Sequence, residues 1–515
     1  MLPLRLAPAA ALLASAIWSV APLQAGQDSE EAEATVARPN VVFILADDLG
    51  YGDLRSYNEA SRIPTPRLDR LAAEGLRFTD AHSPSAVCTP TRYGILTGRY
   101  AWRTALQRNV LWEWDPPLLE EERTTLAELA RTAGYRTACI GKWHLGWNWP
   151  LNDGRTLRDL VPLPALRLPM ELRSTFARMV DLDAAIPGGP LDHGFEHFFG
   201  DDVPHFPPYA FVEDDRLTER PTSTLPPTMF GTPGPMVPGW DLSVVLPTLA
   251  RRAAVWIEQQ EEPFFLYLSL TAPHTPIAPS PHFAGKSGAG PYGDFVHEVD
   301  WVAGVVLDAL ERKGIAKETL VVFASDNGSP GRDGEHMMSG EVNSVRRLQH
   351  DPSGGWRGIK GDIHEGGHRI PLIVRWPGQV EAGRTSDVML SLTDLYRTLA
   401  SAMEAEVPAG NGEDSFDALP LWLDESPQPP RDHLVMQSFE GVLAIREGPW
   451  KLIFSRNHGG FSPDPFVAEG PPGQLYNLQD DPGETRNRFE SEPARVKQLE
   501  ARIRDLIQAG SSRPR

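Results

Sequence analysis

The stretch Val41-Val42-Phe43-Ile44-Leu45-Ala46-Asp47-Asp48 says most about the fold of this chain. Its unbroken apolar run is typical of a strand that is buried on both faces, as in a parallel sheet. Two carboxylates follow the strand directly. Because ligands of open α/β sheets bind beyond the carboxyl ends of the strands, the stretch predicts an α/β fold with a polar site where its first strand ends.

Apolar runs and amphipathic stretches alternate over the next 350 residues. We expect strands at 135–140, 264–270, 320–324 and 372–375, and helices at 65–75, 125–133, 296–312 and 392–400. This alternation predicts a large mixed, mostly parallel sheet sandwiched by helices. Residues 147–238 are Pro-rich and irregular, and we expect them to form surface loops around the site.

The pattern changes after about residue 405. Short apolar segments separated by turns predict strands at 433–437, 442–446, 450–454 and 474–478, followed by a helix at 493–508. We therefore expect a main domain over residues 38–404 and a C-terminal subdomain over residues 405–515, built as a small antiparallel sheet with a helix.

Composition limits the classes of function. The formal charge of -20 argues against a nucleic-acid-binding protein, which needs a basic face. The same charge repels an anionic substrate at long range, so a site for one must hold local Lys, Arg or metal charge. Of the two cysteines, Cys139 lies within a predicted strand and is expected to be a buried apolar residue, although a disulfide with Cys88 is possible in principle.

The N-terminus resembles a secretion signal. Arg5 precedes a short apolar run at 9–17, and small residues permit cleavage after Ala21 or Ala25. We expect a signal peptide over residues 1–25 and a flexible leader over residues 26–37. The apolar run is shorter than the about 20 residues that span a bilayer, so the chain is expected to be exported without a transmembrane anchor. An uncleaved anchor is the alternative.

Three further polar clusters follow predicted strands directly: Lys142-Trp143-His144, His274 and Asp326-Asn327. Together with Asp47 and Asp48 they are expected to converge on one rim of the sheet.

Four of these side chains offer only oxygen as a ligand atom: Asp47, Asp48, Asp326 and Asn327. A hard cation such as calcium prefers that set, and without a cation the neighbouring carboxylates repel one another. Taken alone, an Asp-Asp pair after a strand is more often a turn or a helix cap. The sequence Asn327-Gly328-Ser329 also matches a glycosylation acceptor, an interpretation we set aside because Asn327 is expected inside the site.

The segment Cys88-Thr89-Pro90-Thr91-Arg92 predicts a helix that begins at or just after Cys88. A helix N-terminus attracts anions, and the Arg92 guanidinium suits oxyanions. From the residues alone, Cys88 is an ordinary thiol, either buried or activated as a thiolate by the helix end.

Cys-x-Pro-x-Arg at 88–92, followed by Leu-Thr-Gly-Arg at 96–99, resembles the signature of the sulfatase family. Further segments resemble that family in its own order: Asp47 to Asp53, Gly141 to Gly146, Ala272-Pro273-His274, Ser325 to Gly328, Lys360 to Gly367, Leu475 to Leu478 and Asp481 to Glu484. The resemblance covers essentially the whole mature chain. It implies an alkaline-phosphatase-like fold and hydrolysis of sulfate esters.

The resemblance also implies site roles. A maturation enzyme converts Cys88 to formylglycine, whose hydrate attacks sulfur. By the same resemblance, Asp47, Asp48, Asp326 and Asn327 would bind calcium, with the formylglycine at 88 or a substrate oxygen completing the shell. Arg92 holds the hydrated aldehyde, Lys142 and Lys360 bind the sulfate oxygens, His274 protonates the leaving group, and His144 helps to expel sulfate. The substrate is a sulfated small molecule or glycan, and the location is periplasmic or secreted.

Several points stay open. A polar family contact expected after Gly194 to Gly200 does not align, so Asp202 and His205 are only candidates for it. We expect five other histidines to be structural: His193, His197, His336, His364 and His368. Two alternative functions remain, a phosphodiester or phosphonate hydrolase on the same fold, and a secreted glycan-binding protein whose Cys88 is never converted.

Overall fold

The computed structural model describes residues 38–261, 263–426 and 428–513. The predicted signal peptide (1–25) and leader (26–37) lie outside the described residues. Within the described part of the chain, no helix is both long and apolar enough to cross a membrane.

A mixed sheet of ten strands forms the centre of the described chain, in the order β13-β2-β12-β11-β1-β10-β4-β5-β6-β7. In that order the strands are Arg384–Ser386, Leu76–Phe78, Leu372–Arg375, Thr319–Ser325, Asn40–Asp47, Phe264–Pro273, Arg136–Lys142, His197–Asp201, Val212–Glu213 and Arg216–Leu217. The neighbours from β11 through β1, β10 and β4 to β5 all pair in parallel, whereas β12 pairs antiparallel with both β11 and β2. The predicted mixed, mostly parallel sheet is confirmed.

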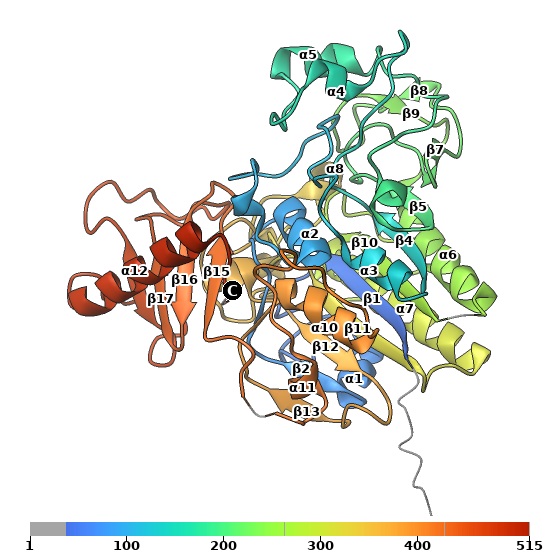
Figure 1. The fold of residues 1–515 in the computed structure, drawn as a ribbon. Helices are drawn as coiled ribbons and strands as arrows, with labels where there is room; N and C mark the ends of the chain where they lie inside the picture. The colour runs from blue at the N-terminus through green and yellow to red at the C-terminus, as the bar shows by residue number, and fades with distance from the viewer. Residues whose placement is uncertain (1–37, 262, 427, 514–515) are drawn as a thin grey trace, which may run out of the picture. The chain divides into compact units, whose positions relative to one another are not determined.

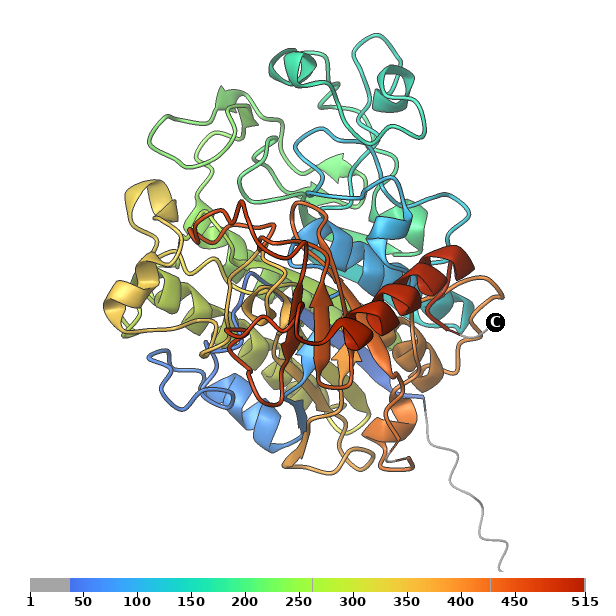
Figure 2. The same ribbon diagram turned by 90° about the vertical axis from the view of Figure 1, so that its left-hand side faces the viewer.

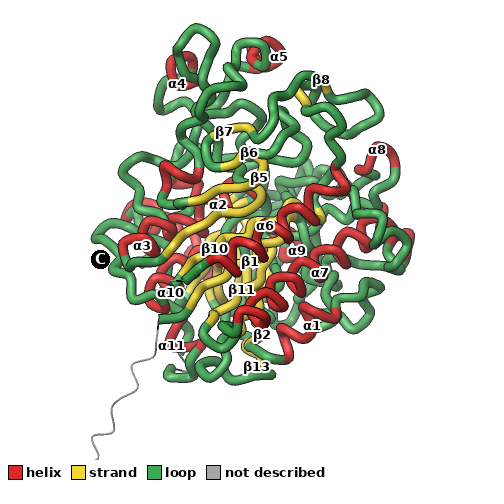
Figure 3. The backbone as a smooth tube through the Cα atoms, turned by 90° about the vertical axis from the view of Figure 1, so that its right-hand side faces the viewer, coloured by secondary structure: helices red, strands yellow, loops and turns green. Residues whose placement is uncertain are grey.

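Helices cover both faces of this sheet (Figures 1 and 3). On one face, α1 (Pro66–Ala73), α6 (Val245–Gln259) and α7 (Gly290–Lys313) pack against Val42 and Ile44 of β1. On the other face, α2 (Cys88–Thr97), α3 (Leu126–Thr132) and α10 (Leu395–Ala402) pack against Val41 and Phe43. Successive side chains of a strand point to opposite faces, so the unbroken apolar run supplies both cores.

The C-terminal strands form a separate antiparallel sheet of four strands: β15 (His433–Gln437), β16 (Leu443–Glu447), β17 (Trp450–Ile453) and β18 (Gln474–Asn477). Helix α12 (Pro493–Ala509) lies across this sheet and buries Leu499 and Ile503 against it (Figure 2). The predicted small sheet with a helix is confirmed. The domain boundary at residues 404/405 stays a prediction.

Our expectation of surface loops over residues 147–238 was wrong in part. Strands β5, β6 and β7 lie in this region and extend the main sheet. The region also contains α4 (Leu157–Leu160), α5 (Met170–Phe176), β8 (Ser223–Thr224) and β9 (Pro235–Met236). These elements are too short to give a periodic pattern in the sequence.

The remaining short elements connect the larger ones. They are β3 (Ala81–His82), β14 (Leu390–Ser391), α8 (His336–Ser339), α9 (Glu365–His368), α11 (Leu419–Trp422) and the 3-10 helices η1 (Ala101–Arg103), η2 (Pro190–His193), η3 (Leu242–Val244), η4 (Ser344–Leu348) and η5 (Leu392–Asp394).

Candidate active site

Four adjacent parallel strands bring the predicted polar residues to one edge of the sheet. Asp47 ends β1 and Lys142 ends β4, while His274 directly follows β10 and Asp326 directly follows β11. The parallel pairing of β11, β1, β10 and β4 places these four strand ends side by side. The predicted convergence at one rim is thus what the structure shows.

Cys88 is the first residue of α2 and points into this rim. Its Sγ lies 3.5 Å from Asp47 Oδ1 and 3.5 Å from Lys360 Nζ. Lys360 arrives from a distant loop that is fixed beside Cys88 by its backbone: Lys360 N donates to Ser329 O at 3.1 Å, and Gly361 N donates to Ala86 O at 2.8 Å. Two chain segments 272 residues apart therefore meet at the thiol.

Three acid–base pairs line the pocket around the thiol. Lys142 Nζ lies 2.8 Å from Asp47 Oδ2, and Lys360 Nζ lies 2.6 Å from Asp48 Oδ1. Arg92 donates to Asp326 Oδ2 at 2.7 Å and also contacts Ser269 Oγ, a residue that sequence reasoning missed. All six charged side chains are buried, so each depends on its partner for stabilisation.

The electrostatics differ between the acids. Burial raises the pKa of Asp47, but the charges of Lys142 and its neighbours outweigh burial and hold that pKa well below its ordinary value. For Asp326, burial and the charge of Asp47 raise the pKa to about 6. The pKa of the Cys88 thiol is also raised, mainly by burial and secondly by the negative charge of Asp326. The thiol is therefore protonated at neutral pH and is a poor nucleophile.

His144 adopts a left-handed backbone conformation, with φ 53°, just after β4. Its backbone N–H donates to Asp202 Oδ1 at 3.1 Å, and its Nε2 lies 2.9 Å from Leu111 O. Its Nδ1 is buried without a hydrogen-bond partner. Three residues earlier, Gly141 of β4 has φ 114°, and a Cβ there would lie 1.8 Å from Ser269 O, so only glycine fits at that position of the strand.

His274 and His205 lie together on the other side of the pocket. Their rings stack at 5.1 Å with an interplanar angle of 15°. His274 Nδ1 lies 2.6 Å from Thr275 O, and its Nε2 lies 3.8 Å from Asp48 Oδ2. Of the two open candidates, His205 is thus beside the site, whereas Asp202 contacts the backbone of His144 and the indole N–H of Trp147 at 3.2 Å.

The oxygen-rich part of the pocket fits a divalent cation. Ligand atoms of Asp47, Asp48, Cys88 and His274 lie within 4.8 Å of one another. Asn327 Oδ1 is buried without a partner, while Asn327 Nδ2 donates to Asp48 Oδ1 at 2.7 Å. Asp326 falls outside that group of four, and its oxygens accept from Arg92 and from the backbone N–H of Asp48. Carboxylate and amide oxygens suit a hard cation.

His82, Glu365 and His368 also cluster closely enough to hold a metal. The Lys451 ammonium, however, lies 3.0 Å from Glu365 Oε1 and 3.0 Å from His368 Nε2. A fixed cation thus already contacts two of the three residues, so we interpret this cluster as a buried salt-bridge network.

The other residues singled out in the sequence lie away from the pocket's charged groups. His193 stacks on Trp143 at 6.2 Å, His197 pairs with Asp214 at 2.8 Å and His364 contacts Gln474 at 3.2 Å. His336 is exposed in α8. Cys139 is buried in β4, and both cysteines are free thiols, so no disulfide joins them.

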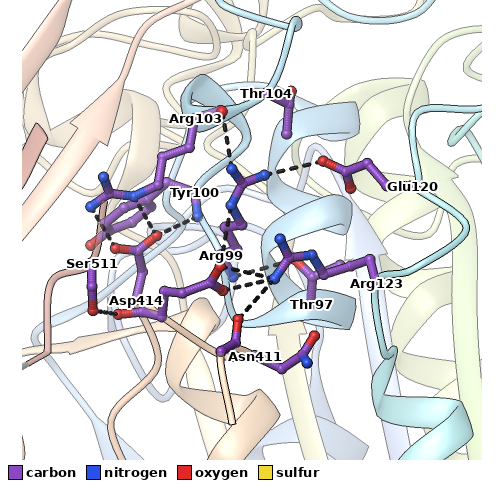
Figure 4. A network of polar contacts seen from close by, with 12 residues as sticks. Thr97, Arg99, Tyr100, Arg103, Thr104, Glu120, Arg123, Asn411, Asp414 and Ser511 are labelled. Atoms are coloured by element: carbon purple, nitrogen blue, oxygen red, sulfur yellow. Dashed lines mark hydrogen bonds and ion pairs between the residues drawn. The ribbon is translucent and has the colours of Figure 1, made fainter. Parts of the chain in front are cut away.

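A polar network anchors the far end of α2 (Figure 4). Arg99 donates to Glu120 Oε1 at 3.1 Å, and the backbone N–H of Tyr100 donates to Asp414 Oδ2 at 2.8 Å. Arg103 binds both oxygens of Asp414 at 2.8 Å. The helix that presents Cys88 is therefore held at its C-terminal end by a buried carboxylate from the later part of the chain.

A family model described as Sulfatase matches residues 39–405. The chain belongs to the sulfatase family. This sulfatase is 32% identical over 485 residues to the N-acetylgalactosamine-6-O-sulfatase of Bacteroides thetaiotaomicron, covering 90% of this chain and 92% of the relative. It is 34% identical over 470 residues to human arylsulfatase A, covering 88% and 84% of the two chains. The protein is therefore a sulfuric ester hydrolase.

Solved structures agree with this assignment. One from Bacteroides thetaiotaomicron, described for the metabolism of multiple glycosaminoglycans, matches this sulfatase with a TM-score of 0.76 and 28% identity over 92% of this chain and 99% of the other. A sulfatase from Pseudoalteromonas sp. matches with a TM-score of 0.68 and 26% identity over 91% and 90%. The expected alkaline-phosphatase-like fold is confirmed by these neighbours.

Proposed function

We propose that this sulfatase removes sulfate from sulfated carbohydrate by means of a formylglycine made from Cys88 and a bound calcium ion. The observation that carries the proposal is that Cys88 Sγ lies 3.5 Å from both Lys360 Nζ and Asp47 Oδ1, among the three buried acid–base pairs of the site. The alternative of an unconverted, silent protein would leave this charged pocket without a nucleophile.

The state of the thiol supports conversion. Burial raises the pKa of Cys88, so the unmodified side chain lacks the thiolate that nucleophilic catalysis needs. A hydrated aldehyde supplies one hydroxyl that attacks sulfur and displaces the alcohol. Deprotonation of its second hydroxyl then breaks the C–O bond to sulfate, which leaves, and regenerates the carbonyl. We assign orientation of the group at position 88 to Arg92, which follows Cys88 by four residues in α2 and donates to Asp326 at 2.7 Å.

The charge balance of the pocket explains how a chain of charge -20 attracts an anion. The three carboxylates Asp47, Asp48 and Asp326 offset the three cations Arg92, Lys142 and Lys360. A calcium ion held by Asp47, Asp48, Asp326 and Asn327 would leave the pocket positive and polarise a sulfate oxygen. Lys142 and Lys360 would then turn toward the sulfate oxygens and stabilise the charge that develops on them.

We assign proton transfer to two histidines, His274 and His144. Because His274 Nδ1–H donates to Thr275 O, its Nε2 is the nitrogen that faces the pocket. The negative charge of a bound sulfate ester favours protonation of this ring, which can then protonate the leaving oxygen. His144 Nδ1, buried without a partner, is the acceptor we assign to the hydroxyl that does not attack.

We take the proposed substrate class from a relative and the proposed location from the N-terminal sequence. The Bacteroides thetaiotaomicron relative is named for N-acetylgalactosamine 6-O-sulfate, and we extend a sulfated-sugar substrate to this chain. The signal-like N-terminus supports export to the periplasm or medium, after maturation by a formylglycine-generating enzyme.

The proposal is tested by assaying inorganic sulfate release from N-acetylgalactosamine 6-sulfate and phosphate-ester cleavage from an aryl phosphodiester. The protein is coexpressed with a formylglycine-generating enzyme, depleted of metal with a chelator and reloaded with calcium. We expect sulfate release that calcium restores and little phosphodiester cleavage. Preferred cleavage of the phosphodiester, or calcium-independent turnover, would contradict the proposal.

A further inference from the structure

The segment Leu111-Trp112 runs along the edge of the active site, and its role is unassigned. Leu111 N donates to Thr89 Oγ1 at 3.2 Å, next to Cys88 in the sequence, and Leu111 O lies 2.9 Å from His144 Nε2. The backbone of this segment is therefore fixed to both the helix that carries Cys88 and a candidate catalytic histidine. The next residue in the chain is Trp112, whose side chain is exposed to solvent.

Trp112 is exposed to 40% although its backbone is held in place. Its backbone N–H donates to Asp115 Oδ2 at 2.8 Å, and Asp115 is itself buried and paired with Arg173. The indole rests on the ring of Phe206 at 6.0 Å with an interplanar angle of 43°. The exposed ring thus contacts the ring of Phe206, and its backbone is held by the hydrogen bond to Asp115.

Phe206 connects this indole to the catalytic histidines. Its buried ring meets His144 edge-on at 6.2 Å and lies 4.3 Å from His205. His205 in turn stacks on His274 and lies 5.9 Å from the half-buried Phe230. A series of ring contacts therefore connects His274 and His205, through the buried Phe206, to the exposed Trp112.

This position distinguishes Trp112 from other exposed aromatic rings. Among the described residues, the exposed large aromatic side chains are Trp112, Phe454 and Phe466. Phe454 and Phe466 belong to the C-terminal part of the chain, whereas Trp112 packs on a ring that touches two histidines of the site. Single exposed apolar residues are common, but a rigidly held one beside a reactive pocket is suited to ligand contact.

We propose that Trp112, supported by Phe206, is a stacking platform that binds the apolar C–H face of the leaving group's pyranose ring. This inference rests on the proposed function and deepens it, because it assigns a cyclic sugar rather than an acyclic alcohol to the leaving-group side. Indole rings pack well against such faces, and a platform fixed before binding loses little conformational entropy.

The test measures the ratio of kcat/KM for N-acetylgalactosamine 6-sulfate to that for a short acyclic alkyl sulfate. Trp112→Ala should lower this ratio about ten-fold, mainly through a higher KM for the sugar, and Trp112→Phe should retain most of it. Phe454→Ala, which removes an exposed ring beside α12, is the matched control and should leave the ratio unchanged. An unchanged ratio in Trp112→Ala would overturn the platform.

A binding experiment separates failure of the platform from failure of the proposed hydrolysis. In the Cys88→Ala background, the sulfated sugar and inorganic sulfate are titrated calorimetrically. Adding Trp112→Ala should weaken sugar binding about ten-fold more than sulfate binding. Equal weakening of both would overturn the inference. Absence of turnover in the wild-type protein, with the sugar-selective binding loss intact, would count only against the proposed function.

Discussion

Asp202 illustrates how a residue next to the site can act through another. Its carboxylate accepts from the backbone N–H of His144, which has a positive φ, and from the indole N–H of Trp147. Both contacts fix the turn that presents the His144 ring. We therefore interpret Asp202 as a positioning residue and not as the missing substrate contact.

Asp202→Ala should lower kcat about 10- to 100-fold with little change in KM, the usual cost of losing a group that orients a reacting residue. Asp202→Asn keeps an oxygen acceptor and should recover most of kcat. The measurement is steady-state kinetics on a sulfate ester. If the Asn variant is as impaired as the Ala variant, charge rather than positioning is the function of Asp202.

Asp326 tests the proposed calcium site. Asp326→Ala should remove bound calcium and most activity, since it deletes one proposed oxygen ligand and leaves the buried Arg92 with only the longer ion pair to Asp47, at 3.4 Å. Calcium content per chain is measured by elemental analysis, with Asp308→Ala on α7 as a surface-acid control. A calcium content equal to that of the wild-type protein would remove Asp326 from the ligand set.

At the residue scale, the sequence was enough to predict site residues that directly follow a strand. It was not enough to predict contacts between segments that lie far apart in the chain. Asp47, Lys142 and Asp326 could be placed because parallel strands share one carboxyl edge. Ser269 contacts Arg92, and Leu111 contacts His144, only because distant segments meet. Neither contact has a local sequence signal.

Among the helices, α7 carries a buried acid whose titration should be visible in stability. Glu298 Oε2 accepts from Ser280 N at 2.8 Å, and Oε1 is buried without a partner. Burial raises the pKa of Glu298 from 4.5 to about 7. A raised folded-state pKa stabilises the protein below about pH 4.5, and this contribution is lost as pH rises through about 7.

Glu298→Gln removes this titration and keeps an oxygen acceptor for Ser280. Relative to the wild-type protein, the variant should gain stability between pH 5 and pH 8, by up to about 3 kcal/mol. Chemical denaturation at several pH values measures the difference. A stability difference that stays constant over this range would show that Glu298 does not titrate there.

At the element scale, most predicted segments match an element of the structure, whereas α6 and β5 were missed. The strand at 372–375 matches β12, and the helix at 493–508 matches α12 to within one residue. Helix α6 was not predicted although Leu246, Leu249, Ala253 and Ile257 repeat with helical spacing, a signal that was present in the sequence. Strand β5 has only five residues and cannot be recognised without its partner β4.

Across the whole described chain, one buried network joins the C-terminal sheet to the segment that carries Lys360. Lys451 of β17 pairs with Glu365 of α9 at 3.0 Å and with Glu484 at 2.9 Å, and all three are fully buried. Lys451→Met would remove the cation that the two buried carboxylates share, leaving Glu365 with Arg369 at 3.0 Å and Glu484 without its ion pair. We expect it to lower the free energy of unfolding by roughly 3–5 kcal/mol.

The exposed Lys497 of α12 supplies the control, since Lys497→Met removes the same charge from the surface. Chemical denaturation compares the two variants. Similar unfolding free energies for both would mean that the network contributes no more than a surface lysine.

The central claim is that Cys88 is an aldehyde in the active protein, and the mass of the peptide containing Cys88 tests it most directly. The protein is purified from its secretory host, alkylated and digested, and the peptide is measured intact. The account predicts a mass about 18 Da below that of the cysteine form, with reactivity toward a hydrazide probe. If the protein hydrolyses sulfate esters and Cys88 is nevertheless found as a cysteine, alkylated by the reagent, the account is contradicted.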